Sequence, residues 1–294
     1  MSQAWLAQRE RGTLGALRLI TWITRHIGYG AGRALLHPIC VYFIVFSKHA
    51  RRSSRAYLAR MFGKPPTWAQ VYRHYHTFAS SILDRVMFVS EGLDKFDVRV
   101  HDGERVAQAL ANGRGCLLLG AHLGSFEVVR AAATTQPGLI INVVMHEGNA
   151  GKILAWTREM APELVTRMIA PGHPDTMLRI RDVLMRGEVV AMLGDRPIGR
   201  SGTQGVDILG GTAQFPTGPL RLAIALDTPV VMFFGLYRGP RCYDLFFETL
   251  DVAAGTSRSR SVALALADYV ERLEVHARSA PFNWFNFYDY WGDA

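Results

Sequence analysis

The stretch GCLLLGAHLGSFEVV, residues 115–129, decides the fold class of this sequence. Its first half is continuously apolar, which is typical of a strand buried on both faces of a parallel sheet. The run stops at His122, between Gly120 and Gly124, which permit a tight turn, and Ser125 then offers a natural helix N-cap. The stretch therefore predicts a strand, a tight turn and a helix, with His122 at the carboxyl end of the strand.

The same alternation continues along most of the chain. Apolar, β-branched runs predict strands at 115–122, 139–145, 165–170, 189–193, 229–238 and 243–252. Helical periodicity predicts helices at 68–88, 103–112, 125–134, 150–161, 175–187, 217–226 and 259–280. This order indicates an α/β fold with a mixed, mostly parallel sheet flanked by helices. The Gly-rich stretch 199–211 matches no nucleotide-binding pattern and is expected to be a loop.

Composition narrows the class of protein. The chain has 294 residues, 49% of them hydrophobic, which excludes a disordered or fibrous protein. Its cysteines, Cys40, Cys116 and Cys242, are far apart and form no CxxC pair, so we expect neither disulfides nor a zinc site. No zinc-protease or nucleophile-elbow motif occurs, and the sequence predicts no metal and no cofactor.

Positive charge is concentrated at the N-terminus. The net charge is +8, and residues 1–64 hold eleven Lys or Arg against one acid, Glu10. Segment 14–46 mixes Trp and Tyr with arginines, and its longest uninterrupted apolar run is shorter than the roughly 20 residues that a spanning helix needs. Such a composition is typical of a helix lying in the headgroup region, and the basic stretch 48–60 would be attracted to anionic lipid. A buried core helix with surface arginines is the alternative.

These observations divide the chain into two expected regions. Residues 1–92 are predicted to form a basic, helical, membrane-associating region, and residues 93–294 an α/β catalytic domain. Nucleic acid is not an expected partner, because long apolar runs interrupt the basic region and no nucleic-acid-binding motif is present. An anionic membrane surface is the expected partner.

His122 and Glu127 are the first candidates for chemistry. With His122 in the turn and Glu127 in the first helical turn, the carboxylate could accept one imidazole N–H and leave the other nitrogen to take a proton. Spacing alone leaves a second interpretation open, in which Glu127 complements the helix dipole and His122 bonds only to backbone.

Four blocks carry a resemblance to a known family: GAHLGSFE, MLGDRP at 192–197, GTAQFPTGPLRLA at 211–223 and an aromatic tail, PFNWFNFYDYWGD, at 281–293. HLGSFE is similar to the HxxxxE/D box of the glycerolipid acyltransferase superfamily. The chain as a whole resembles the bacterial lipid A late-acyltransferase family, which transfers fatty acyl groups from acyl carrier protein to a glycolipid. The resemblance implies a glycerolipid acyltransferase-like fold. The expected location is the cytoplasmic face of the bacterial inner membrane, with either monotopic attachment or a single N-terminal anchor.

The resemblance also implies roles for individual residues. His122 would be the general base and Glu127 its orienting carboxylate, while Asp195 and Arg196 would belong to the rim of the active site. Backbone N–H groups at Gly124 and Ser125 are candidates for stabilising the oxyanion. For Arg196, a structural ion pair is the alternative to binding a phosphate or the thioester.

Two further residues are candidates for binding substrate. Thr217 stands where the glycerol-phosphate branch of the superfamily has an acidic residue, which disfavours a glycerol-phosphate acceptor. Arg221, one turn further on, faces either a lipid phosphate or solvent. The aromatic tail is interpreted as core packing, with an acyl-chain wall or a membrane contact as alternatives.

The predicted function is transfer of a fatty acyl group from acyl carrier protein to a hydroxyl of a lipid A-like glycolipid. The residues ERG at 10–12 and NWFNFYDYW at 283–291 look closer to acyltransferases of aryl polyene pigment clusters, so an aryl polyene chain is an alternative acyl group. A non-catalytic membrane-surface scaffold is the alternative outside enzymology.

Overall fold

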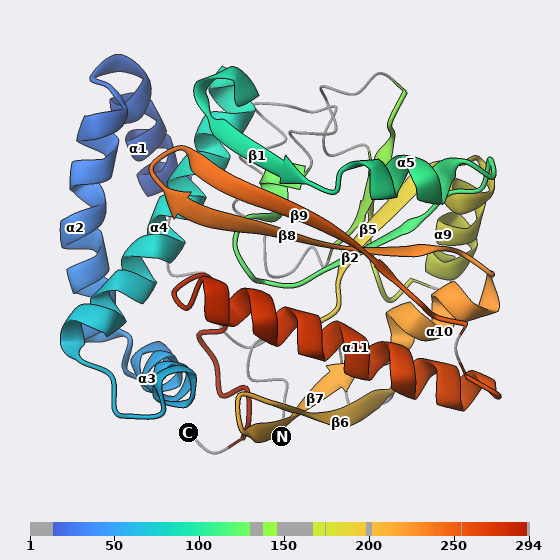
Figure 1. The fold of residues 1–294 in the computed structure, drawn as a ribbon. Helices are drawn as coiled ribbons and strands as arrows, with labels where there is room; N and C mark the ends of the chain where they lie inside the picture. The colour runs from blue at the N-terminus through green and yellow to red at the C-terminus, as the bar shows by residue number, and fades with distance from the viewer. Residues whose placement is uncertain are drawn as a thin grey trace.

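The computed structural model describes residues 14–129, 138–145, 167–173, 175–197, 202–253 and 255–292. Its centre is the mainly parallel sheet with helices on both faces that the sequence predicts (Figure 1). A helical layer from the N-terminus stands against one end of this sheet (Figure 1).

Seven strands form the main sheet in the order β1-β9-β8-β2-β5-β3-β4. The strands are β1 (Asp97–His101), β2 (Leu117–Gly120), β3 (Ile141–Val144), β4 (Met168–Ile169), β5 (Val189–Leu193), β8 (Val230–Gly239) and β9 (Cys242–Leu250). Neighbours run parallel except β8 and β9, which form an antiparallel hairpin. The sheet is therefore mixed and mostly parallel.

A second, two-stranded antiparallel sheet occupies most of the Gly-rich stretch that was expected to be a loop. It consists of β6 (Thr203–Ile208) and β7 (Gly211–Pro216). The expectation of a loop was wrong for these residues, because a Leu209–Gly210 turn with positive φ at both positions connects two paired strands. The start of the stretch, 199–201, lies outside the described residues.

The helices agree with the periodicity where it was recognised. They are α1 (Leu14–His26), α2 (Tyr29–Phe46), α3 (Lys48–Phe62), α4 (Trp68–Glu91), the 3₁₀ turn η1 (Leu93–Lys95), α5 (Glu104–Leu110), α9 (Thr176–Met185), α10 (Gly218–Ala225) and α11 (Arg258–Ser279). Residues 126–129 are helical as well. The helix expected at 150–161 lies outside the described residues.

Alternate residues of the central strands face two hydrophobic clusters. Leu117 and Leu119 of β2 belong to the cluster that also contains α11, whereas Cys116 and Leu118 belong to the cluster with Val106 of α5. A strand buried on both faces needs apolar residues at consecutive positions, which explains the uninterrupted apolar run at residues 116–119.

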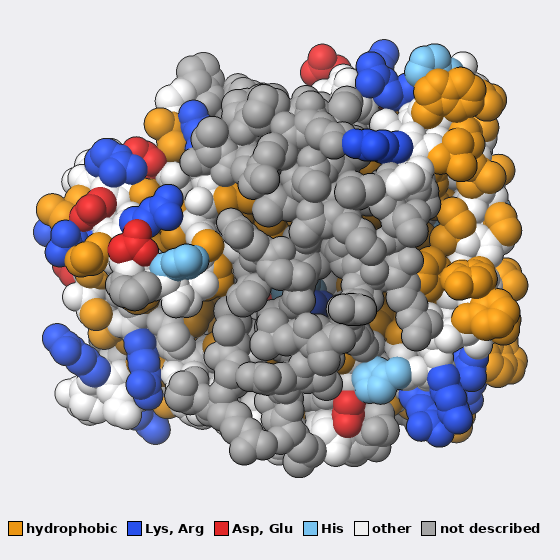
Figure 2. All heavy atoms as spheres, turned by 180° about the vertical axis from the view of Figure 1, so that it is seen from behind, with side chains coloured by type: hydrophobic (Ala, Val, Ile, Leu, Met, Phe, Trp, Pro, Cys, Tyr) orange, Lys and Arg blue, Asp and Glu red, His pale blue; other side chains and the backbone are white. Residues whose placement is uncertain are grey.

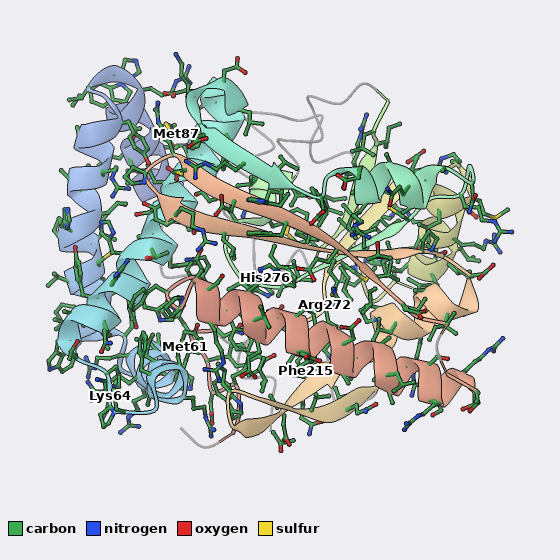
Figure 3. All side chains as sticks on the ribbon, viewed as in Figure 1. Met61, Lys64, Met87, Phe215, Arg272 and His276 are labelled. Carbon is green, nitrogen blue, oxygen red and sulfur yellow. The ribbon has the colours of Figure 1, made fainter. Side chains whose placement is uncertain are left out.

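Helix α11 covers one face of the sheet (Figure 1). Arg272 and His276, labelled in Figure 3, both reach Glu248 of β9, at 2.8 Å and 2.6 Å. These charged contacts fix the helix where its apolar side packs on the strands.

The N-terminal helices share a core with the sheet. Tyr57 and Leu58 of α3 are buried in the same cluster as the strands. A buried carboxylate, Asp84 of α4, accepts hydrogen bonds from Tyr29 of α2 at 2.6 Å and Tyr243 of β9 at 2.8 Å. Asp84 therefore ties α2, α4 and the sheet together, whereas the division of the chain at residue 92 stays a prediction.

We expect Asp84→Ala to lower the free energy of unfolding by about 2–4 kcal/mol, because it leaves two phenol groups without their buried acceptor. Tyr29→Phe should cost about 1 kcal/mol, since it removes one donor and leaves the carboxylate its second. Chemical denaturation measures both. Asp94→Ala at an exposed position is the control, and equal stability of the Asp84→Ala and Asp94→Ala proteins would contradict this role.

Candidate active site

The centre of the candidate site lies where β2 and β5 end. The two strands are parallel neighbours, and their register pairs Gly120 with Leu193. His122 follows β2 by two residues, and Asp195 follows β5 by two residues. Because the strands end side by side, these two side chains meet at the carboxyl edge of the sheet, the usual position of ligand sites in open α/β sheets.

His122 and Asp195 form a two-point contact. Nδ1 of His122 lies 2.7 Å from Oδ1 of Asp195, and the backbone N–H of His122 donates to Oδ2 at 3.1 Å. A carboxylate only accepts, so Nδ1 carries the proton and Nε2 presents a lone pair. No described protein group bonds to Nε2, and the imidazole is 31% exposed. His122 is thus held as a neutral imidazole with its basic nitrogen directed away from the carboxylate.

The surroundings keep the imidazole neutral. Burial lowers the pKa of His122 below its ordinary value of 6.5, and the positive charge of Arg196 lowers it further, while Asp195 opposes both. Burial alone would raise the pKa of Asp195, but His122, Arg196 and Trp284 together hold that pKa below its ordinary value. A neutral base beside an ionised carboxylate is the protonation state that general-base chemistry near pH 7 requires.

Asp195 is fully buried, and its oxygens accept hydrogen bonds from the C-terminal segment, residues 281–290. Oδ2 accepts from the Trp284 indole N–H at 3.1 Å and from the Asn286 amide at 3.4 Å. The backbone oxygen of Asp195 accepts from the Tyr290 hydroxyl at 2.7 Å. A buried charge is tolerated only when it is paired and hydrogen-bonded, and this segment supplies much of that pairing.

Arg196 connects the site to the same segment. Its Nε donates to Asn286 Oδ1 and its Nη2 to the Phe285 carbonyl, each at 2.9 Å, and its guanidinium lies over the Tyr288 ring. These hydrogen bonds join Arg196 to the C-terminal segment, whereas its ion pair with an acid and its binding of phosphate or thioester both stay predictions. Its charge still acts on His122, since it lowers the pKa of the imidazole.

The sequence predicts a hydrogen bond between Glu127 and His122, but the structure gives each of them a different partner. Glu127 is 7% exposed and forms an ion pair with Arg85 of α4 at 2.7 Å. The described contacts of the His122 ring are to Asp195 and not to Glu127. The physical reason is that a buried carboxylate needs a cation, which α4 supplies, while the neighbouring strand end supplies His122 with a closer acceptor.

Gly124 and Ser125 also differ from their expected role. The N–H of Gly124 donates to the Asn283 carbonyl at 2.8 Å, and the N–H of Ser125 donates to the Gly235 carbonyl at 2.7 Å. Both N–H groups therefore already donate to backbone carbonyls, so in this conformation they are not available to stabilise an oxyanion. Gly124 has φ +76°, and a Cβ there would lie 2.0 Å from the Gly235 oxygen, so this turn requires glycine.

The structure does not bring Thr217 or Arg221 to His122 through any described contact. Thr217 is 3% exposed, and its hydroxyl donates to the Gly202 carbonyl at 2.8 Å, which anchors the start of α10. Arg221 is exposed and lines a surface groove between α9 and α10 with Met177 and Leu178. A structural role fits Thr217, and Arg221 faces solvent.

The C-terminal segment is the part of the site that sequence reasoning missed. Beyond its contacts with Asp195 and Arg196, its Phe285 N–H donates to the His122 carbonyl at 2.9 Å, and Leu123 pairs with Trp284 as a β-bridge. The polar residues Asn283 and Asn286, which interrupt the aromatic run, are the feature of the sequence that could have indicated a hydrogen-bonding role for this segment. Within the described ranges, no cluster of three metal-ligating side chains occurs.

Comparison with known proteins gives three findings. The family model described as "Bacterial lipid A biosynthesis acyltransferase" matches residues 10–291. Among solved structures, the chain is similar to the crystal structure of the 1-acyl-sn-glycerophosphate (LPA) acyltransferase PlsC from Thermotoga maritima, with 15% identity, a TM-score of 0.38, and coverage of 84% of this chain and 95% of that one. No curated protein matches. Since the family model spans nearly the whole chain, the chain belongs to the bacterial lipid A biosynthesis acyltransferase family.

Proposed function

We propose that this lipid acyltransferase uses His122 as the general base that activates an acceptor hydroxyl for attack on an acyl thioester. The observation that carries the proposal is the 2.7 Å contact between Nδ1 of His122 and Asp195 in a partly exposed imidazole. This contact implies a proton on Nδ1 and leaves Nε2 basic. A positioned imidazole base contributes typically 10²–10⁴-fold to such a step.

The proposed reaction proceeds without an acyl-enzyme. Nε2 of His122 takes the acceptor hydroxyl proton as the oxygen bonds to the thioester carbonyl carbon. The tetrahedral intermediate then collapses, the C–S bond breaks, and the imidazolium returns its proton to the departing thiolate. The products are an ester and a thiol, and His122 regains its starting state. Asp195 stabilises the transient imidazolium, as expected of a buried carboxylate on Nδ1.

We assign acyl carrier protein as donor and a hydroxyl of a lipid A-like glycolipid as acceptor. The family description names lipid A biosynthesis, which supports the acceptor. The basic N-terminal region, with eleven Lys or Arg in residues 1–64, suits an acidic carrier protein as well as anionic lipid. Arg196 adds a positive charge beside His122 that favours the negative charge of the tetrahedral intermediate.

Lipid mass spectrometry of a deletion strain tests the reaction. We expect a lipid that lacks one acyl group, and we expect the wild-type gene but not His122→Ala to restore the missing mass. The mass difference identifies the transferred group and separates a saturated chain from an aryl polyene chain. Full restoration by His122→Ala would refute the assignment of the base.

The pH dependence of kcat/KM distinguishes the two carboxylates near His122. In the wild type we expect the acidic limb to have its midpoint below 6.5, because the pKa of His122 is lowered and only the neutral ring is a base. Asp195→Asn removes the negative charge that favours the imidazolium, so the rate should fall and the limb should move to still lower pH.

Glu127→Gln is the variant to compare with Asp195→Asn, because it neutralises the other carboxylate near His122. It breaks the ion pair with Arg85, so thermal stability and rate should fall, but the midpoint of the acidic limb should stay in place. A limb that moves in Glu127→Gln and stays in Asp195→Asn would assign the orienting role to Glu127 instead.

We further propose that α1 and α2 lie on an anionic membrane surface. By length and composition alone, α2 is the one described helix that could cross a membrane, and only 17% of it is buried. Figure 2 shows hydrophobic side chains along the edge formed by the N-terminal helices, with Lys and Arg gathered at its lower end. The exposed large apolar residues of the two helices and of the turn between them are Leu19, Trp22, Ile27, Ile39, Val41, Tyr42, Val45 and Phe46.

Contacts with the catalytic region support a helix that lies flat. Arg33 of α2 donates to the Tyr237 hydroxyl of β8 at 3.1 Å, and Tyr29 donates to Asp84 of α4, which also accepts from Tyr243 of β9. Exposed Arg18, Arg25 and Lys48 flank the apolar strip. A helix with an apolar outer side, flanking cations and its inner side bonded to the domain fits the headgroup region.

Sedimentation with vesicles that contain anionic phospholipid tests this surface. The double substitution Val45→Asp and Phe46→Asp should weaken binding at least about tenfold, because it places charge where apolar side chains meet lipid. Val275→Asp, at an equally exposed apolar position of α11, should bind as the wild type does. Unchanged binding of the double variant would contradict the proposal.

A further inference from the structure

The C-terminal segment, residues 281–290, contacts the loops that follow both β2 and β5. The Asn283 carbonyl accepts from Gly124 N–H, the Phe285 N–H donates to the His122 carbonyl, and Tyr290 donates to the Asp195 carbonyl. The backbone of both loops therefore depends on this one segment, which follows α11 and lies far from both loops in the sequence.

Trp284 is the residue of this segment that acts most directly on the catalytic pair. Its ring is 1% exposed, and its indole N–H donates to Oδ2 of Asp195, the oxygen that also accepts the His122 backbone N–H. With Oδ2 held by these donors, Oδ1 is turned toward Nδ1 of His122. The Trp284 indole and the Asn286 amide, at 3.4 Å from Oδ2, therefore orient the Asp195 carboxylate from outside both loops, and the indole is the closer donor.

Trp284 is itself fixed from the far side. Nε2 of His74, on α4, bonds to the Trp284 carbonyl at 3.0 Å, and Nδ1 of His74 lies 2.9 Å from the Ser54 hydroxyl of α3. Since a carbonyl only accepts, Nε2 carries the proton and Ser54 donates to Nδ1. Burial lowers the pKa of His74 to about 4, with the Trp284 carbonyl opposing, so this histidine stays neutral over the working pH range.

We infer that Trp284 is a positioning residue for the proposed acyl transfer: its indole N–H holds Asp195 in the orientation that fixes the tautomer of His122, and His74 holds Trp284 in turn. The inference rests on the proposed function for its catalytic consequence. It assigns a role in the reaction to a tryptophan that touches no reacting atom, and it joins the N-terminal helices to the site by hydrogen bonds.

Trp284→Phe removes the donor and keeps an aromatic ring. We expect kcat to fall about tenfold, because the charged Asp195 carboxylate loses the hydrogen bond that the indole N–H donates to it. KM for both substrates should stay within about twofold of the wild-type value. A carboxylate with fewer donors presents more negative charge to the imidazole, so the pKa of His122 should rise and the acidic limb should move to higher pH by about 0.5.

Trp291→Phe is the matched control. Trp291 packs edge-on against Trp284 with ring centroids 6.1 Å apart, and its buried indole N–H has no acceptor among the described residues. This substitution removes the same atoms from the same aromatic cluster without touching Asp195, so kcat and the acidic limb should stay as in the wild type.

A second readout does not require activity. Diethyl pyrocarbonate modifies neutral imidazole, and peptide mapping by mass spectrometry follows His122 separately, so the pH midpoint of its modification reports the pKa. We expect this midpoint to rise in Trp284→Phe and not in Trp291→Phe. If the wild type transfers no acyl group, the proposed function fails, but the midpoints still decide the positioning role.

Replacing Trp284 with 3-benzothienylalanine, in which sulfur takes the place of the indole N–H, covers the case in which Trp284→Phe does not fold. The expected results are the same as for Trp284→Phe. Equal kcat and equal midpoints in the Trp284 and Trp291 variants would overturn the inference, as would a loss of rate in both with the midpoint unmoved, which packing alone would produce.

Discussion

The hydrogen bond between Nδ1 of His122 and Oδ1 of Asp195 is the contact on which the proposed site depends. A fully buried carboxylate is costly unless donors surround it, and here the donors are His122, Trp284 and Asn286. Each donor that stabilises the charge also restricts the direction of the carboxylate. The arrangement that makes the buried charge tolerable therefore also determines which imidazole nitrogen is basic.

The sheet explains why these two residues meet. β2 and β5 are central parallel strands whose ends are aligned, and each is followed after two residues by a polar side chain. The remaining support comes from distant parts of the chain, with α4 holding Glu127 through Arg85 and the C-terminal segment holding Asp195. The helical layer that we propose to lie on lipid is thus bonded to the same framework as the His122–Asp195 pair, through Ser54, His74 and Trp284.

Local pattern was enough to predict the elements with strong periodicity. The strand at 189–193 was predicted at the bounds it has, and α11 differs by one residue at each end. β1 was missed because it is half exposed and carries charges, and the β6–β7 hairpin was missed because its glycines and polar residues resemble a loop. Fold class and the placement of His122 at a strand end were confirmed.

The hydrogen-bond partner of His122 could not be predicted from the residues near it in the sequence. Glu127 is five residues away in sequence, whereas Asp195 is reached only through the register of two strands that lie more than seventy residues apart. The resemblance pointed to Asp195 and Arg196 as neighbours of the site, but not to their bonds. The aromatic tail shows neither the helical nor the strand periodicity of apolar residues, so it was interpreted as core packing. That interpretation did not identify Trp284 and Asn286 as hydrogen-bond donors to Asp195.

The most direct measurement is a long-range ¹H–¹⁵N NMR spectrum of the imidazole of His122 in protein labelled with ¹⁵N-histidine, assigned by comparison with His122→Ala. Near neutral pH we expect one protonated nitrogen, Nδ1, and an unprotonated Nε2, a state that Asp195→Asn perturbs and Glu127→Gln preserves. A proton on Nε2 with a bare Nδ1, or a tautomer that follows Glu127 and ignores Asp195, would contradict this expectation.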